Sequence, residues 1–504
     1  MNIIEIQQEL KERYKQYISS FVNIKDASIA QKVSETLEGD RFWPETLIQF
    51  NPNYAQGRDV QDMIMQGLPI HPKLKSFFSS RFYLHQQQAI ELGCQGKEFV
   101  VTSGTGSGKS RTFMATIFNY VLQNQAACQD KTIAIIVYPM NALINSQCEE
   151  LQKYKEHYEE ETGEECPFTF NRYTGQEGQD VRQRIQNTPP NIILTNYMML
   201  ELLMTRAGEE ENLRKCFLDN LRFLVFDELH TYRGMQGSDV AFLIRRIKAL
   251  AKNKVLCFGT SATMVADEEM TEYESKKKVA EIASCIFGSS FTPEQVIDET
   301  LTVGLLDRPI DRTELLQNIN GRIVLKDKDT FKNYATAIWI EQNIAMKKVD
   351  GRFVRGKPVS VHVMAEQLAE CCKESVEKCE AHINALLDTC NKMNQTADTN
   401  LLPYKIHQFI AQTGNVYATL GRQDDREIQT VDCLYSETEE GGERTMMYPV
   451  VFSRMSGHEF YCVTLKGDTM FPRQFEDLSR NANKDEDEEN DNSSDGYVFI
   501  AHRV

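Results

Sequence analysis

The clearest chemical signal in this chain is a glycine-rich stretch, Ser103-Gly104-Thr105-Gly106-Ser107-Gly108-Lys109-Ser110. Apolar runs precede it at 99–101 and follow it at 112–118, which predicts a strand, a turn and a helix. This context is typical of a phosphate-binding loop, because glycines let backbone N–H groups close around phosphates and the helix N-terminus favours negative charge. Lys109 can then reach the β- and γ-phosphates, and the Ser110 hydroxyl can ligate Mg²⁺. The strict pattern begins with glycine rather than Ser103, so a turn that binds nothing is the alternative.

A second signal stands at the end of another apolar run, where Asp227-Glu228-Leu229-His230 follows residues 221–226. In phosphate-loop enzymes an acidic residue at the end of a neighbouring strand holds Mg²⁺, and we assign that role to Asp227. Glu228 would position or deprotonate the water that attacks the γ-phosphate. An isolated Asp-Glu pair is usually a solvated turn, but a phosphate loop earlier in the chain favours the metal-site interpretation.

Strand-like and helix-like runs alternate from residue 81 to residue 264, which predicts a mostly parallel α/β sheet. Ligands of such sheets bind at the carboxyl ends of the strands. The glycine-rich stretch, Asp227 and Ser261-Ala262-Thr263 all fall at predicted strand ends, so we expect them to meet at one edge. The last helix of this segment, at 238–251, is expected to bury five apolar side chains: Val240, Phe242, Leu243, Ile247 and Leu250.

These motifs resemble those of superfamily 2 helicases of the DEAD/DEAH-box type. Asp227 to His230 is similar to motif II of that family, and Ser261 to Thr263 is similar to motif III. The family's adenine-sensing Q motif resembles Phe82-Tyr83-Leu84-His85-Gln86. Motifs Ia, Ib and Ic resemble Tyr138-Pro139-Met140-Asn141-Ala142-Leu143, Tyr173-Thr174-Gly175 and Leu194-Thr195-Asn196-Tyr197.

The resemblance implies a RecA-like ATP-binding domain that uses ATP and Mg²⁺ and binds nucleic acid, which we expect to be DNA. It implies that Lys109, Asp227 and Glu228 are catalytic and that Ser110 and Asp227 hold Mg²⁺. The nucleotide would contact Gln86, Ser103, Gly104, Thr105, Gly106, Ser107, Gly108, Lys109, Ser110 and His230.

Nucleic acid would contact Pro139, Gly175 and Thr195 through its phosphate backbone, by the same resemblance. Ser261 and Thr263 would couple the nucleotide site to strand movement. A helix N-cap is the alternative reading of Thr195-Asn196.

A longer string, Asp227-Glu228-Leu229-His230-Thr231-Tyr232-Arg233-Gly234, resembles one branch of this family, the YprA-like bacterial helicases. That branch includes repair helicases and the helicases of phage-defence systems such as DISARM, so antiviral defence and DNA repair are the pathways that the resemblance implies.

The composition suits a protein of several globular domains. The chain has 504 residues, 41% of them hydrophobic, and a net charge of −17, which argues against a simple basic coat for nucleic acid. The 13 cysteines include no CxxC pair and are expected to be reduced thiols, with no zinc site. We find neither a signal peptide nor an apolar run of about 18 residues, and we expect a cytoplasmic protein.

We expect four regions along the chain: an N-terminal helical extension at 1–80, the RecA-like ATP-binding domain at 81–300, a helical accessory region at 301–400 and a small β-rich module at 401–504. The overall class is α/β with a mixed α+β accessory region. An acidic run at 484–495 is expected to be a flexible loop.

A working superfamily 2 motor has two RecA-like domains, and we find motifs for only one. The nearest match to the arginine motif of the second domain, at 421–426, lacks the required glutamine, and we interpret it as a turn. We therefore expect a truncated chain or a split subunit whose partner supplies the second domain, with weak ATP hydrolysis by the isolated chain. Two functions stay open: the ATP-binding half of a helicase or translocase, and a nucleotide-switched interaction or scaffold subunit without unwinding activity.

Overall fold

The structure is a computed structural model, and it describes residues 3–21, 23–39, 43–104, 106–206, 208, 211–262, 270–349, 351–397, 400–410, 415–421, 425–436, 444–473 and 493–500. The chain divides into two compact units. We call Asn53–Thr302 with Val349–Phe353 the α/β unit, and Met1–Pro52, Val303–Lys348 and Val354–Val504 the accessory unit. Within the described ranges, none of the helices has both the length and the apolar character of a membrane span.

A seven-stranded parallel sheet forms the centre of the α/β unit, with the order β5-β6-β4-β7-β8-β3-β9. Its strands are β3 (Phe99–Thr102), β4 (Ala134–Val137), β5 (Phe170–Tyr173), β6 (Ile192–Thr195), β7 (Phe223–Phe226), β8 (Leu256–Ser261) and β9 (Val296–Asp298). The predicted parallel α/β architecture is therefore confirmed.

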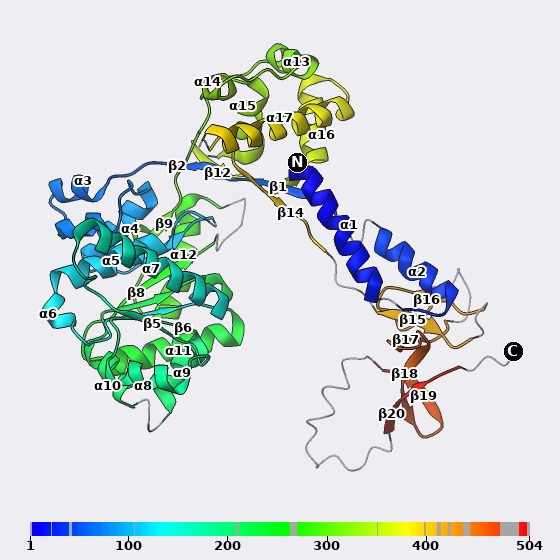
Figure 1. Cartoon of the computed structure of the whole chain (residues 1–504), viewed down its shortest axis with the longest axis horizontal. Helices are drawn as coiled ribbons and strands as arrows, with labels where there is room; N and C mark the ends of the chain where they lie inside the picture. Colours follow the sequence, from blue (N-terminus) through cyan, green and yellow to red (C-terminus); the bar gives the residue numbers. More distant parts are fainter. Residues whose placement is uncertain are drawn as a thin grey trace. The chain divides into compact units, whose positions relative to one another are not determined.

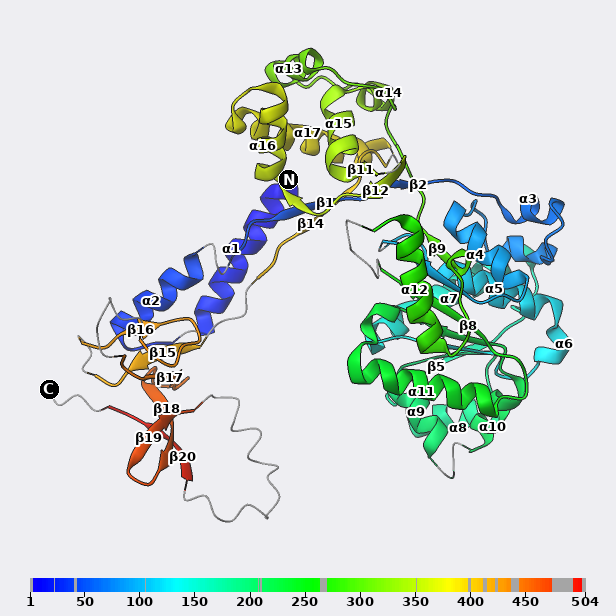
Figure 2. The same ribbon diagram turned by 180° about the vertical axis from the view of Figure 1, so that it is seen from behind.

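Helices cover both faces of this sheet (Figures 1 and 2). One face packs against α4 (Leu84–Cys94), α5 (Ser110–Gln123) and α7 (Asn141–Thr162). The other face packs against α8 (Gln179–Asn187), α9 (Tyr197–Thr205), α10 (Glu211–Asn220), α11 (Gly234–Leu250) and α12 (Glu272–Phe287). The shorter elements of the unit are β2 (Asn53–Tyr54), α3 (Val60–Met65), η1 (Pro72–Ser76), α6 (Gln125–Cys128), η2 (Leu229–Thr231), η3 (Pro293–Gln295) and β10 (Leu301–Thr302).

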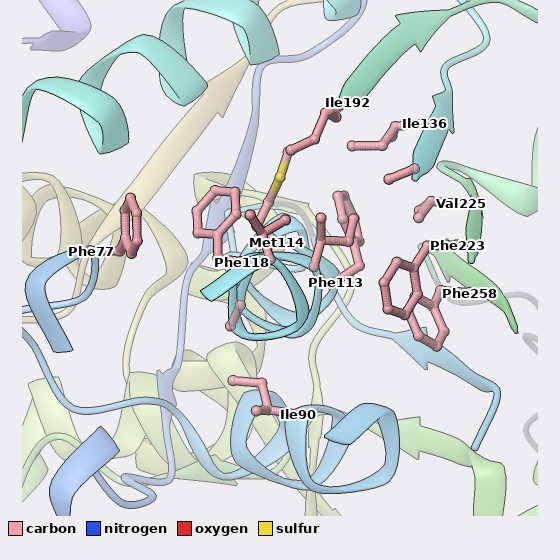
Figure 3. Close-up of a cluster of buried hydrophobic side chains, with 14 of the residues drawn as sticks. Phe77, Ile90, Phe113, Met114, Phe118, Ile136, Ile192, Phe223, Val225 and Phe258 are labelled. Carbon is pink, nitrogen blue, oxygen red and sulfur yellow. The ribbon is translucent and has the colours of Figure 1, made fainter. Parts of the chain in front are cut away.

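The continuous apolar runs of β4 and β7 follow from burial on both faces, whereas the edge strand β5 is partly polar and exposed. Along β7, Phe223 and Val225 pack into the core beneath α5, whereas Leu224 and Phe226 pack into the core beneath α11. Figure 3 shows α5 side chains, among them Met114, lying between the strands and Ile90 of α4. Burying one such side chain stabilises the fold by about 1.5–3 kcal/mol, so the sheet is held rigidly between its two layers.

Residues 53–80, which we expect to belong to an N-terminal extension, lie in the α/β unit. Val60, Met63 and Leu74 are buried in the same core as the α5 side chains. The expected burial of two α11 side chains is wrong: Phe242 and Leu250 are 68% and 56% exposed. The buried stripe of α11 consists of Val240, Leu243, Ile244 and Ile247, whose spacing of three and four residues keeps them on one face.

The accessory unit contains a helical part and antiparallel sheets. Its helices are α1 (Ile3–Phe21), α2 (Ala27–Glu38), α13 (Arg312–Asn320), α14 (Lys328–Lys332), α15 (Ala335–Ile340), a π-helix η4 (Glu341–Ala345), α16 (Val361–Cys372) and α17 (Val376–Ala397). A small antiparallel sheet places β1 (Leu47–Phe50) between β13 (Val359–Ser360) and β14 (Tyr404–His407). β11 (Met346–Val349) and β12 (Arg352–Arg355) pair with each other.

A second antiparallel sheet, with the order β16-β15-β17-β18-β19, lies in the region predicted to be β-rich. Its strands are β15 (Val416–Thr419), β16 (Ile428–Gln429), β17 (Met447–Phe452), β18 (Glu459–Lys466), β19 (Thr469–Pro472) and β20 (Ser493–Val498), of which β20 pairs with β18. The predicted acidic loop at 484–495 lies mostly outside the described residues, but its last part, from Ser493, forms β20 instead. Backbone pairing of residues 493–498 with 461–466 is a long-range interaction that local composition does not predict.

Candidate functional site

The carboxyl edge of the parallel sheet brings three predicted motifs together, since parallel strands all end on the same side. The loop after β3 holds the glycine-rich stretch, the loop after β7 begins at Asp227, and β8 ends at Ser261. Because β3 pairs with β8 and β8 pairs with β7, these three segments are neighbours. The main chain joins two of them directly, through a hydrogen bond from Ser103 N to Ser261 O of 3.1 Å.

Lys109 lies at the centre of this edge and is 9% exposed. Its ammonium group donates a hydrogen bond to Ser103 O at 2.9 Å, and it lies 3.9 Å from Glu228 Oε1. A cation held between a phosphate loop and a carboxylate can bind the terminal phosphates of a nucleotide without large movement. Ser110, the next residue, begins α5, so the positive end of the dipole of that helix lies at the same loop and favours an anion there.

Ser103 departs from the glycine of the strict phosphate-loop pattern, and the structure explains why serine fits. Ser103 is not among the non-glycine residues with positive φ, whereas Gly106 and Gly108 have φ of +83° and +69°. The Ser103 hydroxyl is buried and lies 2.6 Å from the Ser107 hydroxyl, which closes the loop across its base. The loop therefore needs glycine at the two later positions and gains a hydrogen bond at the first.

Asp227 and Glu228 are held by the neighbouring strand β8. Thr260 Oγ1 donates a hydrogen bond to Asp227 Oδ1, and Glu228 N–H donates to Thr260 Oγ1 at 3.3 Å. Glu228 Oε2 accepts from Ala262 N–H at 3.3 Å. Glu228 has a φ of +53°, an unusual conformation for a residue with a side chain, which turns the chain sharply after Asp227. Such strained backbone recurs at functional sites where the surroundings fix it.

Burial raises the pKa of Asp227 to about 6, and the negative charge of Glu228 acts in the same direction. The hydrogen bond from Thr260 and the charge of Lys109 act against this rise in pKa. A buried carboxylate beside a second carboxylate is destabilised without a cation, so a divalent ion would be attracted to this position. Carboxylate and hydroxyl oxygens are ligands that Mg²⁺ prefers, and Asp227 with Ser110 fits that requirement.

His230 connects the Asp-Glu segment with the end of β8. Its Nδ1 lies 3.1 Å from Ser261 Oγ and 3.2 Å from Glu228 Oε2. The imidazole therefore touches both the group that we expect to activate water and the group that we expect to couple hydrolysis to movement. Thr263, the other predicted coupling residue, lies outside the described residues, as does Thr105 of the glycine-rich stretch.

Gln86 is buried in α4 and contacts the glycine-rich loop from the opposite side. Its amide group donates to Ser107 O at 2.9 Å and to Gly108 O at 3.1 Å, and its oxygen accepts from Tyr83 N–H at 3.0 Å. His85 Nε2 also lies 3.2 Å from Ser107 O. Burial lowers the pKa of His85 below the ordinary value of a histidine, against the opposing effect of the contact with Ser107 O. Gln86, the one residue of α4 that we predict to contact the nucleotide, is thus joined to the loop by hydrogen bonds.

The three residues predicted to contact nucleic acid also lie at this edge. Pro139 lies in the loop after β4, Gly175 lies in the loop after β5, and Thr195 is the last residue of β6. Gly175 is exposed and has a φ of +88°. Thr195 is 2% exposed, and its hydroxyl donates to Tyr173 O at 2.6 Å, so this side chain holds β6 against β5. Asn196 caps α9 by accepting from Met199 N–H, as the alternative interpretation of this pair predicts.

Two further residues at this edge belong to none of the sequence motifs, and we did not predict them. Thr260 precedes Ser261 directly and could have been found only by knowing the pairing of β7 with β8. Glu299 follows β9, and its carboxylate accepts from Gly104 N–H at 2.8 Å. Because β9 is nearly 200 positions from the loop in sequence, no local pattern reveals that contact.

Residues 83–271 match the family model described as DEAD/DEAH box helicase. Residues 83–271 therefore form a domain of the DEAD/DEAH box helicase type, and the chain is also similar to several relatives.

Two of these relatives are named as uncharacterized ATP-dependent helicases. MJ1574 of Methanocaldococcus jannaschii is 32% identical over 197 residues, which are 38% of this chain and 27% of that protein. YprA of Bacillus subtilis is 30% identical over 234 residues, which are 44% of this chain and 28% of that protein. The Druantia protein DruE of Escherichia coli is 24% identical over an alignment of 379 positions, which covers 52% of this chain and 20% of that protein. The chain thus spans less than a third of the length of each of these relatives.

Proposed function

We propose that this chain is the ATP-binding half of a nucleic-acid helicase or translocase. The observation that carries the proposal is the sharing of one sheet edge by two sets of loops. The loops after β3, β7 and β8 hold Lys109, Asp227 and Glu228, and the loops after β4, β5 and β6 lie further along the same edge. A nucleotide and a nucleic-acid strand bound to this edge would contact one rigid body.

The chemistry that we propose is hydrolysis of ATP by an attacking water. Glu228 orients this water and accepts its proton, while the Lys109 ammonium group stabilises the charge on the γ-phosphate. Asp227 and Ser110 would hold Mg²⁺, which supplies neutralisation of phosphate charge when bound. Gln86 and the glycine-rich loop fix the nucleotide, so that binding of the base and of the phosphates depends on one connected group of residues.

The nucleic acid that we propose is single-stranded DNA, held by its phosphates at Pro139, Gly175 and the segment that begins at Thr195. Contacts to phosphates give affinity without reading the base sequence. We further propose that a second RecA-like domain completes the ATP site, on another chain or in a longer form of this one. In related phosphate-loop enzymes an added arginine raises the rate by about 10³–10⁵-fold. The isolated chain should therefore bind ATP and hydrolyse it slowly.

Binding of labelled oligonucleotides to the full chain tests this proposal. We expect a non-hydrolysable ATP analogue with Mg²⁺ to change the affinity for single-stranded DNA, measured by fluorescence anisotropy, and K109A to abolish this change. K153A, on the exposed surface of α7, is the matched control and should behave as the wild type. A parallel titration with single-stranded RNA distinguishes the two nucleic acids. An affinity that is undetectable in every nucleotide state would contradict the proposal and favour the scaffold function.

A further inference from the structure

Thr260 is a buried polar residue at the site that no motif of the chain includes. It lies on β8, directly before Ser261, and β8 pairs with β7, whose following loop begins at Asp227. Its exposed fraction is 0%. A buried hydroxyl needs hydrogen-bond partners, and the partners that the structure gives it are the two acidic residues of the site.

A threonine hydroxyl has one proton and two lone pairs, so it can donate once and accept at the same time. Thr260 uses both abilities: it donates to Asp227 Oδ1 and accepts from Glu228 N–H. The donated bond fixes the rotation of the Asp227 carboxylate. The accepted bond holds the backbone of Glu228, whose left-handed conformation is one that L-residues rarely adopt.

The close approach of β8 to the loop after β7 makes this double contact possible. Gly259 precedes Thr260, and a Cβ at that position would lie 2.3 Å from Leu229 Cδ1 and 3.3 Å from Phe287 Cε2. Glycine therefore lets the strand pass beneath the turn of Glu228 and Leu229. The Thr260 hydroxyl is placed at the one position from which it reaches both acidic residues.

We propose that Thr260 is a positioning residue that presents Asp227 and Glu228 to the magnesium–nucleotide complex. This inference rests on the proposed function, because it assigns Thr260 a role toward the same site. Residues that orient metal ligands from behind typically change metal affinity or activity by about 10–100-fold when mutated. Loss of the Thr260 hydroxyl should therefore weaken the gain in ATP affinity that Mg²⁺ provides.

Three variants of the full chain test the role of Thr260. T260V keeps the shape of the side chain and removes the hydroxyl, whereas T260S keeps the hydroxyl. T132V is the matched control, since Thr132 is also fully buried and its hydroxyl donates to Pro190 O at 2.8 Å before the start of β4, at the opposite end of the strands. T132V therefore controls for the loss of a buried hydroxyl as such, and the melting temperature of each variant shows that it is folded.

The measured quantity is the Mg²⁺ gain, the ratio of the dissociation constants of fluorescent ATP in EDTA and in Mg²⁺. We expect T260V to reduce this ratio by about tenfold, and T260S and T132V to stay within about twofold of the wild type. A T260V ratio within twofold of the wild type would overturn the role of Thr260, as would an equal loss in T132V. If the wild type itself bound ATP equally well in EDTA and in Mg²⁺, the proposed function would be overturned together with this inference.

Discussion

His230 and Ser261 meet 3.1 Å apart, between the loop after β7 and the end of β8. The same imidazole nitrogen lies 3.2 Å from Glu228 Oε2. A change in the position of Glu228 on nucleotide binding can therefore be passed to β8 through two contacts. This arrangement gives a physical route from the γ-phosphate to the part of the edge that we expect to move with nucleic acid.

Replacement of either partner should uncouple these events. In a complex with the second RecA-like domain, S261A should retain most of the basal ATP turnover and lose most of its stimulation by single-stranded DNA. H230A also removes a predicted nucleotide contact, so it should lose the same stimulation from a lower basal turnover. Because both residues serve one contact, the double variant should lose no more than either single variant. Additive losses would show that the two residues act separately. The measurement is steady-state ATP turnover with and without DNA, for the wild type, the two single variants and the double variant.

We predict that Gln86 contributes to a preference for adenine, and this role can be tested separately from its hydrogen bonds to the loop. Q86A loses hydrogen bonds to Ser107 O and Gly108 O, so affinity for every nucleotide should fall. If Gln86 also contacts adenine, the affinity for ATP should fall about tenfold more than the affinity for GTP. Q88A, at the exposed neighbouring position of α4, is the control. Equal losses for ATP and GTP would limit Gln86 to fixing the loop.

We predict that replacing Arg426 strongly destabilises the accessory unit. Its side chain is 1% exposed, and it lies 2.5 Å from Asp26 Oδ2 and 3.4 Å from Glu459 Oε1. R426M should destabilise this unit by about 3–5 kcal/mol, because it leaves two carboxylates buried without a cation. The only two tryptophans of the chain, Trp43 and Trp339, lie in the accessory unit, so tryptophan fluorescence during urea unfolding reports on it.

A control for this measurement is R13M, which breaks the exposed pair of Arg13 with Glu9 and should leave the unfolding midpoint nearly unchanged. An R426M midpoint equal to that of the control would contradict the structural role of Arg426. Such a result would also reopen the discarded match between residues 421–426 and an arginine motif.

We predict that His382 makes the stability of the accessory unit sensitive to acid. Burial lowers the pKa of His382 to about 4, from 6.5 for an ordinary histidine. The unfolded chain then binds more protons between these values, so stability is complete above pH 6.5 and is lost as pH falls toward 4. The loss should approach about 3 kcal/mol. H382Q should flatten this dependence, measured by tryptophan fluorescence during urea unfolding at pH 8, 6 and 4.5. If the free energy of unfolding of H382Q depended on pH as steeply as that of the wild type, His382 would not be the source of the acid sensitivity.

The centre of the sheet in the α/β unit could be predicted from the sequence because strands such as β3, β4 and β7 are short apolar runs, each followed by a recognisable segment. Phe223 to Phe226 and the Asp-Glu pair after it specify both a buried strand and its carboxyl end. The positions of Lys109 and Asp227 follow from that regularity. Their catalytic roles stay predictions until the variants are measured.

Contacts between distant strands could not be predicted, because no local pattern encodes them. Thr260 reaches Asp227 only through the pairing of β8 with β7, and Glu299 reaches Gly104 only through the pairing of β9 with β3. The error at Phe242 has a similar origin. Hydrophobicity alone placed it in the core, whereas the spacing of Val240, Leu243 and Ile247 defines a buried face that excludes it.

The measurement that tests the central claim most directly is ATP binding and single-turnover cleavage by the full chain, for the wild type and E228Q. The account predicts Mg²⁺-dependent ATP binding of similar affinity in both proteins and slow cleavage by the wild type. It predicts cleavage at least about 10²-fold slower in E228Q, because the variant cannot accept the proton of the attacking water. Equal cleavage by the two proteins, or no Mg²⁺-dependent ATP binding by the wild type, would contradict the account.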